Sequence, residues 1–302
     1  MFATFGKSWR LVKASYGVLK QDKQLLIFPI MSTIGLILVT LAMMFPLALS
    51  GVLEAVTSSE EVSGGQSFLG FIFAFAFYFA TYTVIIFSNT ALIGAAMIRL
   101  DGGKPTFSDG IRIARERLGT ILGWASIAAT VGMILNSLQA MIDDSDNIVG
   151  QIIGSIVLSL VGFAWNLMTF LVIPVFVVEN IGPVDAIKRS GSLVKQTWGE
   201  NITGTFSMGI IQFLISIAIF LLIGLPLFFL AASTESTALL IFAVVVIVVV
   251  MGAVSIFFSA LNGIFQAALY KYAVNGGDTE AVSDFFDPSL IAGAFEPKPA
   301  RR

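Results

Sequence analysis

The chain has 302 residues, of which 57% are hydrophobic and 12% charged, with a formal net charge of −2. A soluble domain of this length cannot bury so much apolar surface, and the apolar residues form continuous runs of twenty or more, unlike the alternating strands of a β-barrel. The composition therefore predicts an all-α integral membrane protein. The chain contains no Cys and no His, which excludes disulfides, thiolate metal sites and histidine-based catalysis.

Residues 1–23 predict a basic amphipathic helix. Its apolar residues recur with spacings of three and four from Phe5 through Trp9 and Tyr16, so they share one helical face, while Arg10 and Lys13 fall on another. Such a helix is suited to lie at the membrane interface. It is equally suited to pack its apolar face against the rest of the protein. A cleaved signal peptide is disfavoured, because the apolar run that follows is too long for one.

Six long apolar runs follow this segment. Each exceeds the ~20 residues that a helix needs to cross the apolar core of a bilayer. The sequence therefore predicts six transmembrane helices, several of them long enough to tilt or to contain a break. The runs occupy residues 24–53, 67–99, 118–142, 148–178, 202–232 and 237–273.

The charged residues are distributed unevenly between the connections, and this predicts the orientation. All 17 Lys and Arg lie in the N-terminal segment, in the second and fourth connections, or at the end of the chain from Lys271. The positive-inside rule then predicts a multi-pass protein of the cell membrane with both termini in the cytoplasm. The remaining loops carry acids and no bases, namely Glu54, Glu60, Glu61, Asp143, Asp144, Asp146 and Glu235.

A pattern recurs along the chain. Asp109 and Asp185 each begin a basic amphipathic segment, and each follows an Asn by about twenty residues, Asn89 and Asn166 respectively. Asn262 has a related place before the C-terminal segment, and a glycine turn follows each of the three Asn. The pattern predicts three units, each a basic interfacial helix followed by a hairpin of two spans, related by a pseudo-threefold axis.

These units define the predicted domain organisation. Residues 1–275 form a six-span membrane domain with repeats at about 1–100, 101–180 and 181–275. Residues 276–302 form a cytoplasmic C-terminal tail.

The segment PVFVVENIGPVDAIKRSGSLVKQTW, residues 174–198, carries the most distinctive motif. A span ends in an acid, a glycine turn follows, and the sequence DAIKRS precedes a Trp. This resembles a superfamily of mostly uncharacterised prokaryotic membrane proteins, which includes the membrane domain fused to some glycerophosphodiester phosphodiesterases. The opening sequence FGKSWRLVKASYGVLKQDKQLLIFP is similar to the start of one uncharacterised six-span family in that group. The resemblance implies the six-span layout and brings no established catalytic role.

Polar residues within the spans form one candidate site. Asn89, Asn166 and Asn262 occupy related positions in the second span of each hairpin, and Gln266 lies one turn beyond the last of them. Hydrogen bonding between helices, at about 0.6–2 kcal/mol for each contact, is the favoured interpretation. The alternative is a ring of amides that lines a polar cavity.

Charged residues at the span ends form two further candidates. Glu179, Gly182 and Arg189 predict a turn clamp, in which Glu179 pairs with Lys188 or Arg189 and fixes the angle between the span and the next helix. A lipid-headgroup or ion site is the less favoured interpretation of this clamp. The second candidate is a lipid or partner surface on the cytoplasmic face. It comprises Arg10, Lys13, Arg112, Arg115, Lys188, Arg189 and Lys195.

The middle of each predicted span lacks ionisable residues, which disfavours proton relays and ion-coupled carriers. Phosphate-loop and HExxH motifs are also absent, so an enzyme is the least favoured class, and no cofactor, metal or nucleic acid is expected. The first hypothesis is a non-enzymatic accessory or scaffold protein whose basic face engages membrane lipids, anionic ones above all, or a protein partner. The alternative is a transporter or pore for lipid-like or neutral solutes along the pseudo-threefold axis. The oligomeric state is left open.

Overall fold

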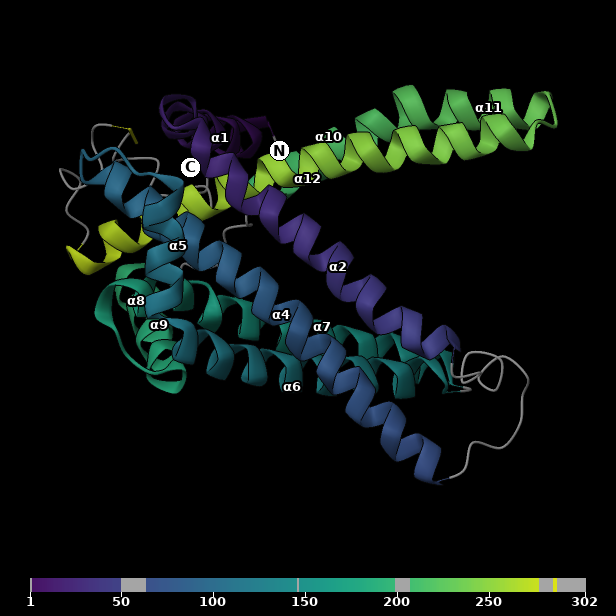
Figure 1. Cartoon of the computed structure of the whole chain (residues 1–302), viewed down its shortest axis with the longest axis horizontal. Coiled ribbons are helices and arrows are strands. Elements are labelled where there is room, and N and C mark those ends of the chain that lie inside the picture. Colours follow the sequence, from purple (N-terminus) through teal and green to yellow (C-terminus); the bar gives the residue numbers. More distant parts are fainter. Residues whose placement is uncertain (1, 50–63, 146, 199–206, 277–284, 287–302) are drawn as a thin grey trace, which may run out of the picture. The chain divides into compact units, whose positions relative to one another are not determined.

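The computed structural model of the chain describes residues 2–49, 64–145, 147–198, 207–276 and 285–286 (Figure 1). Every regular element in these ranges is helical, which confirms the expected all-α class for this part of the chain. The predicted tail, residues 276–302, lies outside the described residues except for 276 and 285–286. In chain order the elements are α1 (Phe2–Gln21), η1 (Lys23–Leu26), α2 (Ile27–Leu49), α4 (Gly64–Leu100), α5 (Phe107–Glu116), α6 (Leu118–Asp143), α7 (Ile148–Thr169), α8 (Val172–Glu179), α9 (Pro183–Trp198), α10 (Ser207–Ile219), η3 (Phe220–Gly224), α11 (Leu225–Ser233) and α12 (Thr237–Val274).

Six helical segments in the described ranges are long and apolar enough to cross a membrane, which confirms the predicted number. Their ends agree with the predicted runs to within a few residues wherever both are described. Residues 50–53 of the first predicted run and 202–206 of the fifth lie outside the described residues. The six segments are Lys23–Phe45, Gly70–Leu100, Leu118–Asp143, Ile148–Glu179, Ile211–Ser233 and Thr237–Val274.

The apolar side chains of these segments are mostly exposed. In the segment Thr237–Val274, only 6% of the most apolar window is buried, and on the segment before it Leu222 and Phe229 are 77% and 68% exposed. Contiguous apolar surface on this scale is unfavourable in water, whereas in a bilayer the lipid tails cover it. A helix also satisfies its backbone hydrogen bonds internally, as a lipid-exposed segment must.

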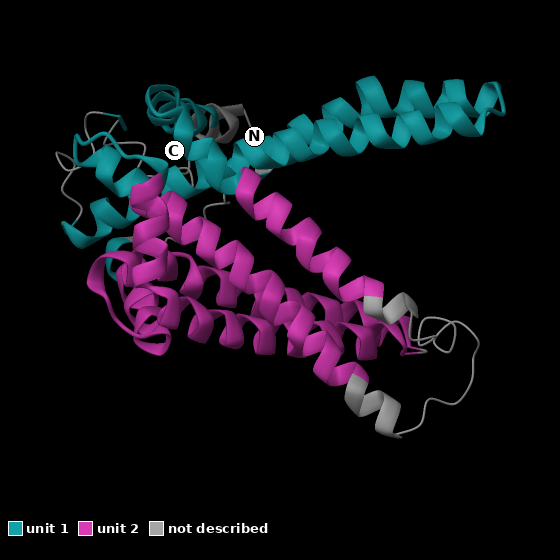
Figure 2. Ribbon diagram, in the orientation of Figure 1, with its two compact units in different colours: residues 1–29, 95–107, 195–302 teal, residues 30–94, 108–194 magenta. Residues whose placement is uncertain are grey.

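The chain divides into two compact units, each considered by itself below (Figure 2). Unit 1 comprises residues 1–29, 95–107 and 195–302, and unit 2 comprises 30–94 and 108–194. Helices α2, α4, α5 and α9 each contribute residues to both. The three predicted repeats are distributed over the two units, so the pseudo-threefold relation between them stays a prediction.

Close helix packing in unit 2 depends on one glycine. A Cβ atom at Gly35 of α2 would lie 2.7 Å from Cγ1 of Val84 on α4, and a β-branched side chain in a helix has little freedom to move aside. Glycine therefore permits the close approach of the two helices. Helices α6 and α7 pack along each other, with the rings of Trp124 and Trp165 stacked at 5.8 Å between centroids.

The fourth span is interrupted between α7 and α8. Pro174 follows the interruption, and because proline has no N–H and its ring clashes with the carbonyl four residues earlier, a straight helix cannot continue past Phe170. The backbone tightens instead, and the N–H of Phe170 donates to the carbonyl of Leu167 at 3.4 Å. The N–H of Leu171 turns to another helix, where the hydroxyl of Ser190 on α9 accepts its hydrogen bond at 3.0 Å.

In unit 1, helix α1 packs against α10 and α12. Leu11, Val18 and Leu19 are buried on the packed side. The expected apolar stripe is only partly covered, since Trp9 and Tyr16 remain 40% and 47% exposed. The helical spacing correctly places these aromatic residues beside the buried face, but the face that the other two helices cover is narrower than the stripe.

Candidate functional site

The basic connections are built from the short helices α5 and α9, which begin just before Asp109 and Asp185. An acid in the first turn and a base in the last, as in both helices, interact favourably with the helix dipole. The docked side of each helix includes small residues, with Ala114 and Ala186 fully buried, and in α9 it also includes Leu193 and Val194. On α4, a Cβ at Gly94 would lie 2.9 Å from side-chain atoms of Ile113, so this glycine allows α5 to lie close against the span.

The bases on these helices other than Arg189 face away from the protein. The side chains of Arg112 and Lys188 are 59% and 74% exposed, and Arg10, Lys13, Arg115 and Lys195 are also exposed. Arg112 pairs with Asp109 at 3.6 Å and Glu116 at 3.2 Å, while Lys188 pairs with Asp185 at 3.5 Å. Such exposed pairs within one helix are weak, about 0.3–0.5 kcal/mol, so the charges remain available to a ligand.

Glu179 and Arg189 lie together across the turn between α8 and α9. The Nε atom of Arg189 donates to both carboxylate oxygens of Glu179, at 2.9 and 3.1 Å. The left-handed residue of the turn is Asn180, with φ of 52°, and not the nearby Gly182, which is exposed. With Arg189 38% exposed, the pair contributes at most about 1 kcal/mol, so its main effect is on the geometry of the turn.

A second contact holds the same end of α8. The guanidinium of Arg117, at the start of α6, donates from Nη2 to the carbonyl oxygen of Val177 at 3.2 Å. This carbonyl lies in the last turn of the helix, where backbone acceptors have no helical donor. The ends of α6, α8 and α9 are therefore joined by two arginines, of which the sequence interpretation included only Arg189.

The residues of the predicted polar cluster lie in both units. Asn89 and Asn166 belong to unit 2, and Asn262 belongs to unit 1. Asn89 is half-buried, whereas Asn166 and Asn262 are exposed, and neither exposed side chain donates a hydrogen bond to another described residue. Gln266 is half-buried on the same helix as Asn262. A cluster of all four residues stays a prediction.

An ionic cluster that sequence reasoning did not identify joins the helix ends of unit 1. We call it the Arg99 cluster, and Arg99 at the end of α4 is its centre. Nε of Arg99 lies 2.8 Å from Oδ2 of Asp22, and both side chains are only 15% exposed. Its guanidinium also donates to the side chain of Gln21 and, at 2.9 Å, to the carbonyl oxygen of Gly103. The end of α4 is thereby fixed to the connection between α1 and η1.

Helix α12 joins the Arg99 cluster through Lys271. The Nζ atom of Lys271 donates to Oδ1 of Asp101 at 2.6 Å and to the carbonyl oxygen of Leu100 at 3.1 Å. Gly102 follows Asp101 and has φ of 83°, a conformation that favours glycine. The chain turns at this residue, before the carbonyl of Gly103 that accepts from Arg99. The signal in the sequence is the position of Arg99 and Lys271, each a single base at the end of a long apolar run.

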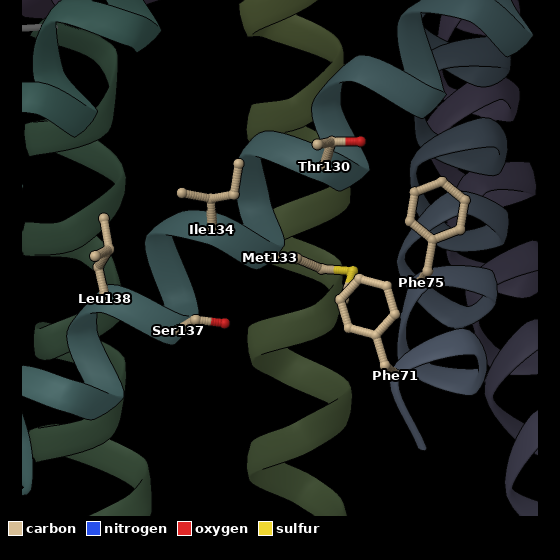
Figure 3. Close-up of a pocket in the computed structure, with 7 residues that line it drawn as sticks. All are labelled: Phe71, Phe75, Thr130, Met133, Ile134, Ser137 and Leu138. Carbon is tan, nitrogen blue, oxygen red and sulfur yellow. The ribbon is translucent and has the colours of Figure 1, made fainter. Parts of the chain in front are cut away.

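The described residues also line apolar cavities that are open at the surface. One of about 470 Å³ lies between α4 and α6 in unit 2 (Figure 3). Phe71 and Phe75 line it from α4, and Met133 of α6 points toward Phe71. The hydroxyl of Thr130 donates to its own helix, at the carbonyl oxygen of Ser126, so it is not free to donate to a ligand. In the described part of the chain, no three carboxylates gather as a metal site would require.

In the part of the chain that the structure describes, all regular elements are helical, and six long apolar helices are compatible with a multi-pass membrane protein. The chain belongs to a family of unknown function (DUF6159), whose model matches residues 68–280. The matched region includes five of the six long apolar helices, together with α5 and α9. A comparison with curated proteins finds no match. The match agrees with the resemblance to an uncharacterised family, while the resemblance to the membrane domain of glycerophosphodiester phosphodiesterases stays an expectation.

Proposed function

We propose that the protein is a non-enzymatic membrane protein of accessory or scaffold type, whose helices α1, α5 and α9 bind anionic lipid headgroups. The observation that supports this most is the arrangement of α5 and α9, which dock small residues on the protein and leave their bases exposed. An amphipathic helix of this kind is suited to the membrane interface. Two spans separate α1 from α5, and two separate α5 from α9, so the three helices lie on the same side of a membrane.

The exposed bases would then form a belt at headgroup level. A Lys or Arg near an anionic membrane surface contributes about 1 kcal/mol to the attraction. Arg10, Arg115 and Lys195 form no ion pair with another described residue, so no intramolecular contact has to be broken before they bind lipid. The complete belt comprises Arg10, Lys13, Arg112, Arg115, Lys188 and Lys195.

Replacing the six belt residues by Gln is expected to reduce the anionic phospholipid that copurifies with the protein at least about fivefold, the factor that one base at the surface supplies. The retained phosphatidylglycerol per protein would be measured by mass spectrometry of lipid extracts. The control exchanges Lys and Arg at the same six positions, which preserves charge and should preserve retention. Equal retention by the Gln variant would overturn the lipid proposal, and the belt would then act only as a determinant of orientation.

The proposal places the belt and both termini in the cytoplasm, because bases are retained on that side of the membrane. The natural chain has no Cys, so single cysteines can report the orientation. Cysteines at Asp144 and Thr237 are expected to react with an impermeant maleimide in intact cells. Cysteines at Lys104 and Lys188 should react only after permeabilisation. Reaction of the second pair in intact cells would show the opposite orientation.

The alternative function is a transporter or pore for lipid-like or neutral solutes. It requires a polar path past the three Asn residues along the pseudo-threefold axis. The cavity in Figure 3 lies within unit 2 and is lined mainly by apolar side chains, so it supplies no such path. The geometry therefore gives less support to transport than to the headgroup proposal.

A further inference from the structure

We propose that the cavity beneath α1 binds one acyl chain of an anionic phospholipid, with Lys13 binding its phosphate. The cavity has a volume of about 590 Å³ and lies in unit 1 between α1, α10 and α12. A volume of this size is within the range of small-molecule sites. Trp9, Lys13 and Tyr16 line it from α1, and Ala253, Phe257 and Phe258 line it from α12.

The walls of the cavity fit a hydrocarbon chain. Phe258 is 4% exposed at the wall, and the ring of Tyr16 lies 6.0 Å from that of Phe257. Trp9 and Tyr16 are the large apolar side chains that packing leaves uncovered in the part of α1 whose burial is described, and both border the cavity. Tyr and Trp commonly occupy the level of the headgroups, where one part of the ring system is apolar and another is hydrated. An acyl chain in the cavity would cover the exposed aromatic surface.

The charge at the cavity selects the headgroup. Lys13 is exposed, and its Nζ atom lies over the Trp9 ring, 6.0 Å from the centroid, close enough for a cation–π attraction that holds the ammonium in place. No carboxylate lines the cavity, and no described acid pairs with Lys13. A free cation beside an apolar cavity complements an amphiphile with an anionic head, and the hydrogen bond from an ammonium to a phosphate is a strong one.

This inference rests on the proposed function in one respect, the position of α1 at the membrane surface. It goes beyond the proposed function, because the belt would attract any anionic lipid without a defined binding site. The cavity is instead a single site that saturates and that depends on particular residues.

The experiment uses phosphatidylcholine nanodiscs that contain the protein and increasing fractions of phosphatidylglycerol brominated on its acyl chains. Bromine quenches indole fluorescence at short range, so the emission of Trp9 reports an occupied cavity. This emission is taken as the difference between the protein and its Trp9→Phe variant. We expect quenching that saturates with the phosphatidylglycerol fraction and exceeds the quenching by brominated phosphatidylcholine at equal fractions. Equal quenching by the two lipids would overturn the inference.

Two variants test the cavity and its charge. Ala253→Phe fills the cavity from α12 and should abolish the saturable quenching, while Ala238→Phe, an equally exposed position at the other end of the same helix, should not. Lys13→Gln should raise the half-saturating lipid fraction about fivefold. Lys20→Gln removes an exposed base of the same helix that belongs neither to the belt nor to the cavity lining, and it should leave that fraction unchanged.

The outcomes separate the inference from the proposed function. Equal effects of Lys13→Gln and Lys20→Gln, or unchanged quenching in Ala253→Phe, would overturn the cavity and leave the belt standing. A different pair of results would support the cavity and overturn the belt. In that case the natural protein shows saturable quenching, and the Gln variant of the six belt residues still retains its copurified lipid. Because Ala253 is exposed, Phe at this position adds bulk to open space. Circular dichroism of the variant checks that its helices are intact, and saturable quenching in an intact variant counts against the inference.

Discussion

Replacing Arg99 by Ala is expected to lower the free energy of unfolding by about 3 kcal/mol, the lower end of the range for breaking a buried ion pair. The guanidinium lies 2.8 Å from Asp22, and the side chains of both residues are 85% shielded from the surroundings. Without Arg99, the side chain of Asp22 would remain at a shielded position and lose its partner. The variant also loses the hydrogen bonds to Gln21 and Gly103.

The measurement is unfolding in mixed micelles, followed by circular dichroism as the fraction of denaturing detergent rises. Arg112→Ala is the matched control, because Arg112 is 59% exposed and pairs only within its own helix; its cost should stay near 0.5 kcal/mol. Asp22→Asn combined with Arg99→Ala should cost less than the sum of the single changes, since each removes the same contact. Equal costs for Arg99→Ala and Arg112→Ala would show that the Arg99 cluster has no special role in stability.

The Arg99 cluster also shows where prediction from the sequence ends. The six spans could be predicted, because the length of an apolar run measures directly whether a helix crosses a bilayer. Asp22, Arg99 and Lys271 are far apart in the chain, and their meeting depends on where each helix ends and on how it is rotated. The spacing of apolar residues gives neither the end of a helix nor its rotation accurately enough to predict a single hydrogen bond.

The same reasoning applies to helix α1. The spacing of Trp9, Val12 and Tyr16 predicts residues that share a face, but only the neighbouring helices determine how much of that face is covered. Val12 is 6% exposed, while Trp9 and Tyr16 are 40% and 47% exposed. Glu179 and Arg189 lie on either side of a single short turn, so the sequence interpretation could name them as partners. The cavity beneath α1 could not be predicted, because it is formed by helices from opposite ends of the chain.

Replacing Ser190 by Ala is expected to destabilise the protein by about 2 kcal/mol, within the range for a buried backbone group that loses its hydrogen-bond partner. Pro174 interrupts the fourth span, and the carbonyl of Leu167 accepts from Phe170 at the interruption. The N–H of Leu171 is therefore left to the hydroxyl of Ser190, and both residues are fully buried. The cost of an unsatisfied backbone group rises in apolar surroundings.

Ser126→Ala is the matched control for this prediction, because the hydroxyl of Ser126 only donates to the carbonyl of Leu122 in its own helix, and its removal leaves no backbone N–H unpaired. Ser190→Thr keeps a hydroxyl at the position and should recover part of the stability. Hydrogen exchange provides an independent measurement, in which the amide of Leu171 should exchange faster in Ser190→Ala while amides in α6 keep their rates. A cost for Ser190→Ala no larger than that for Ser126→Ala, together with unchanged exchange at Leu171, would mean that the interruption is stabilised by apolar packing alone.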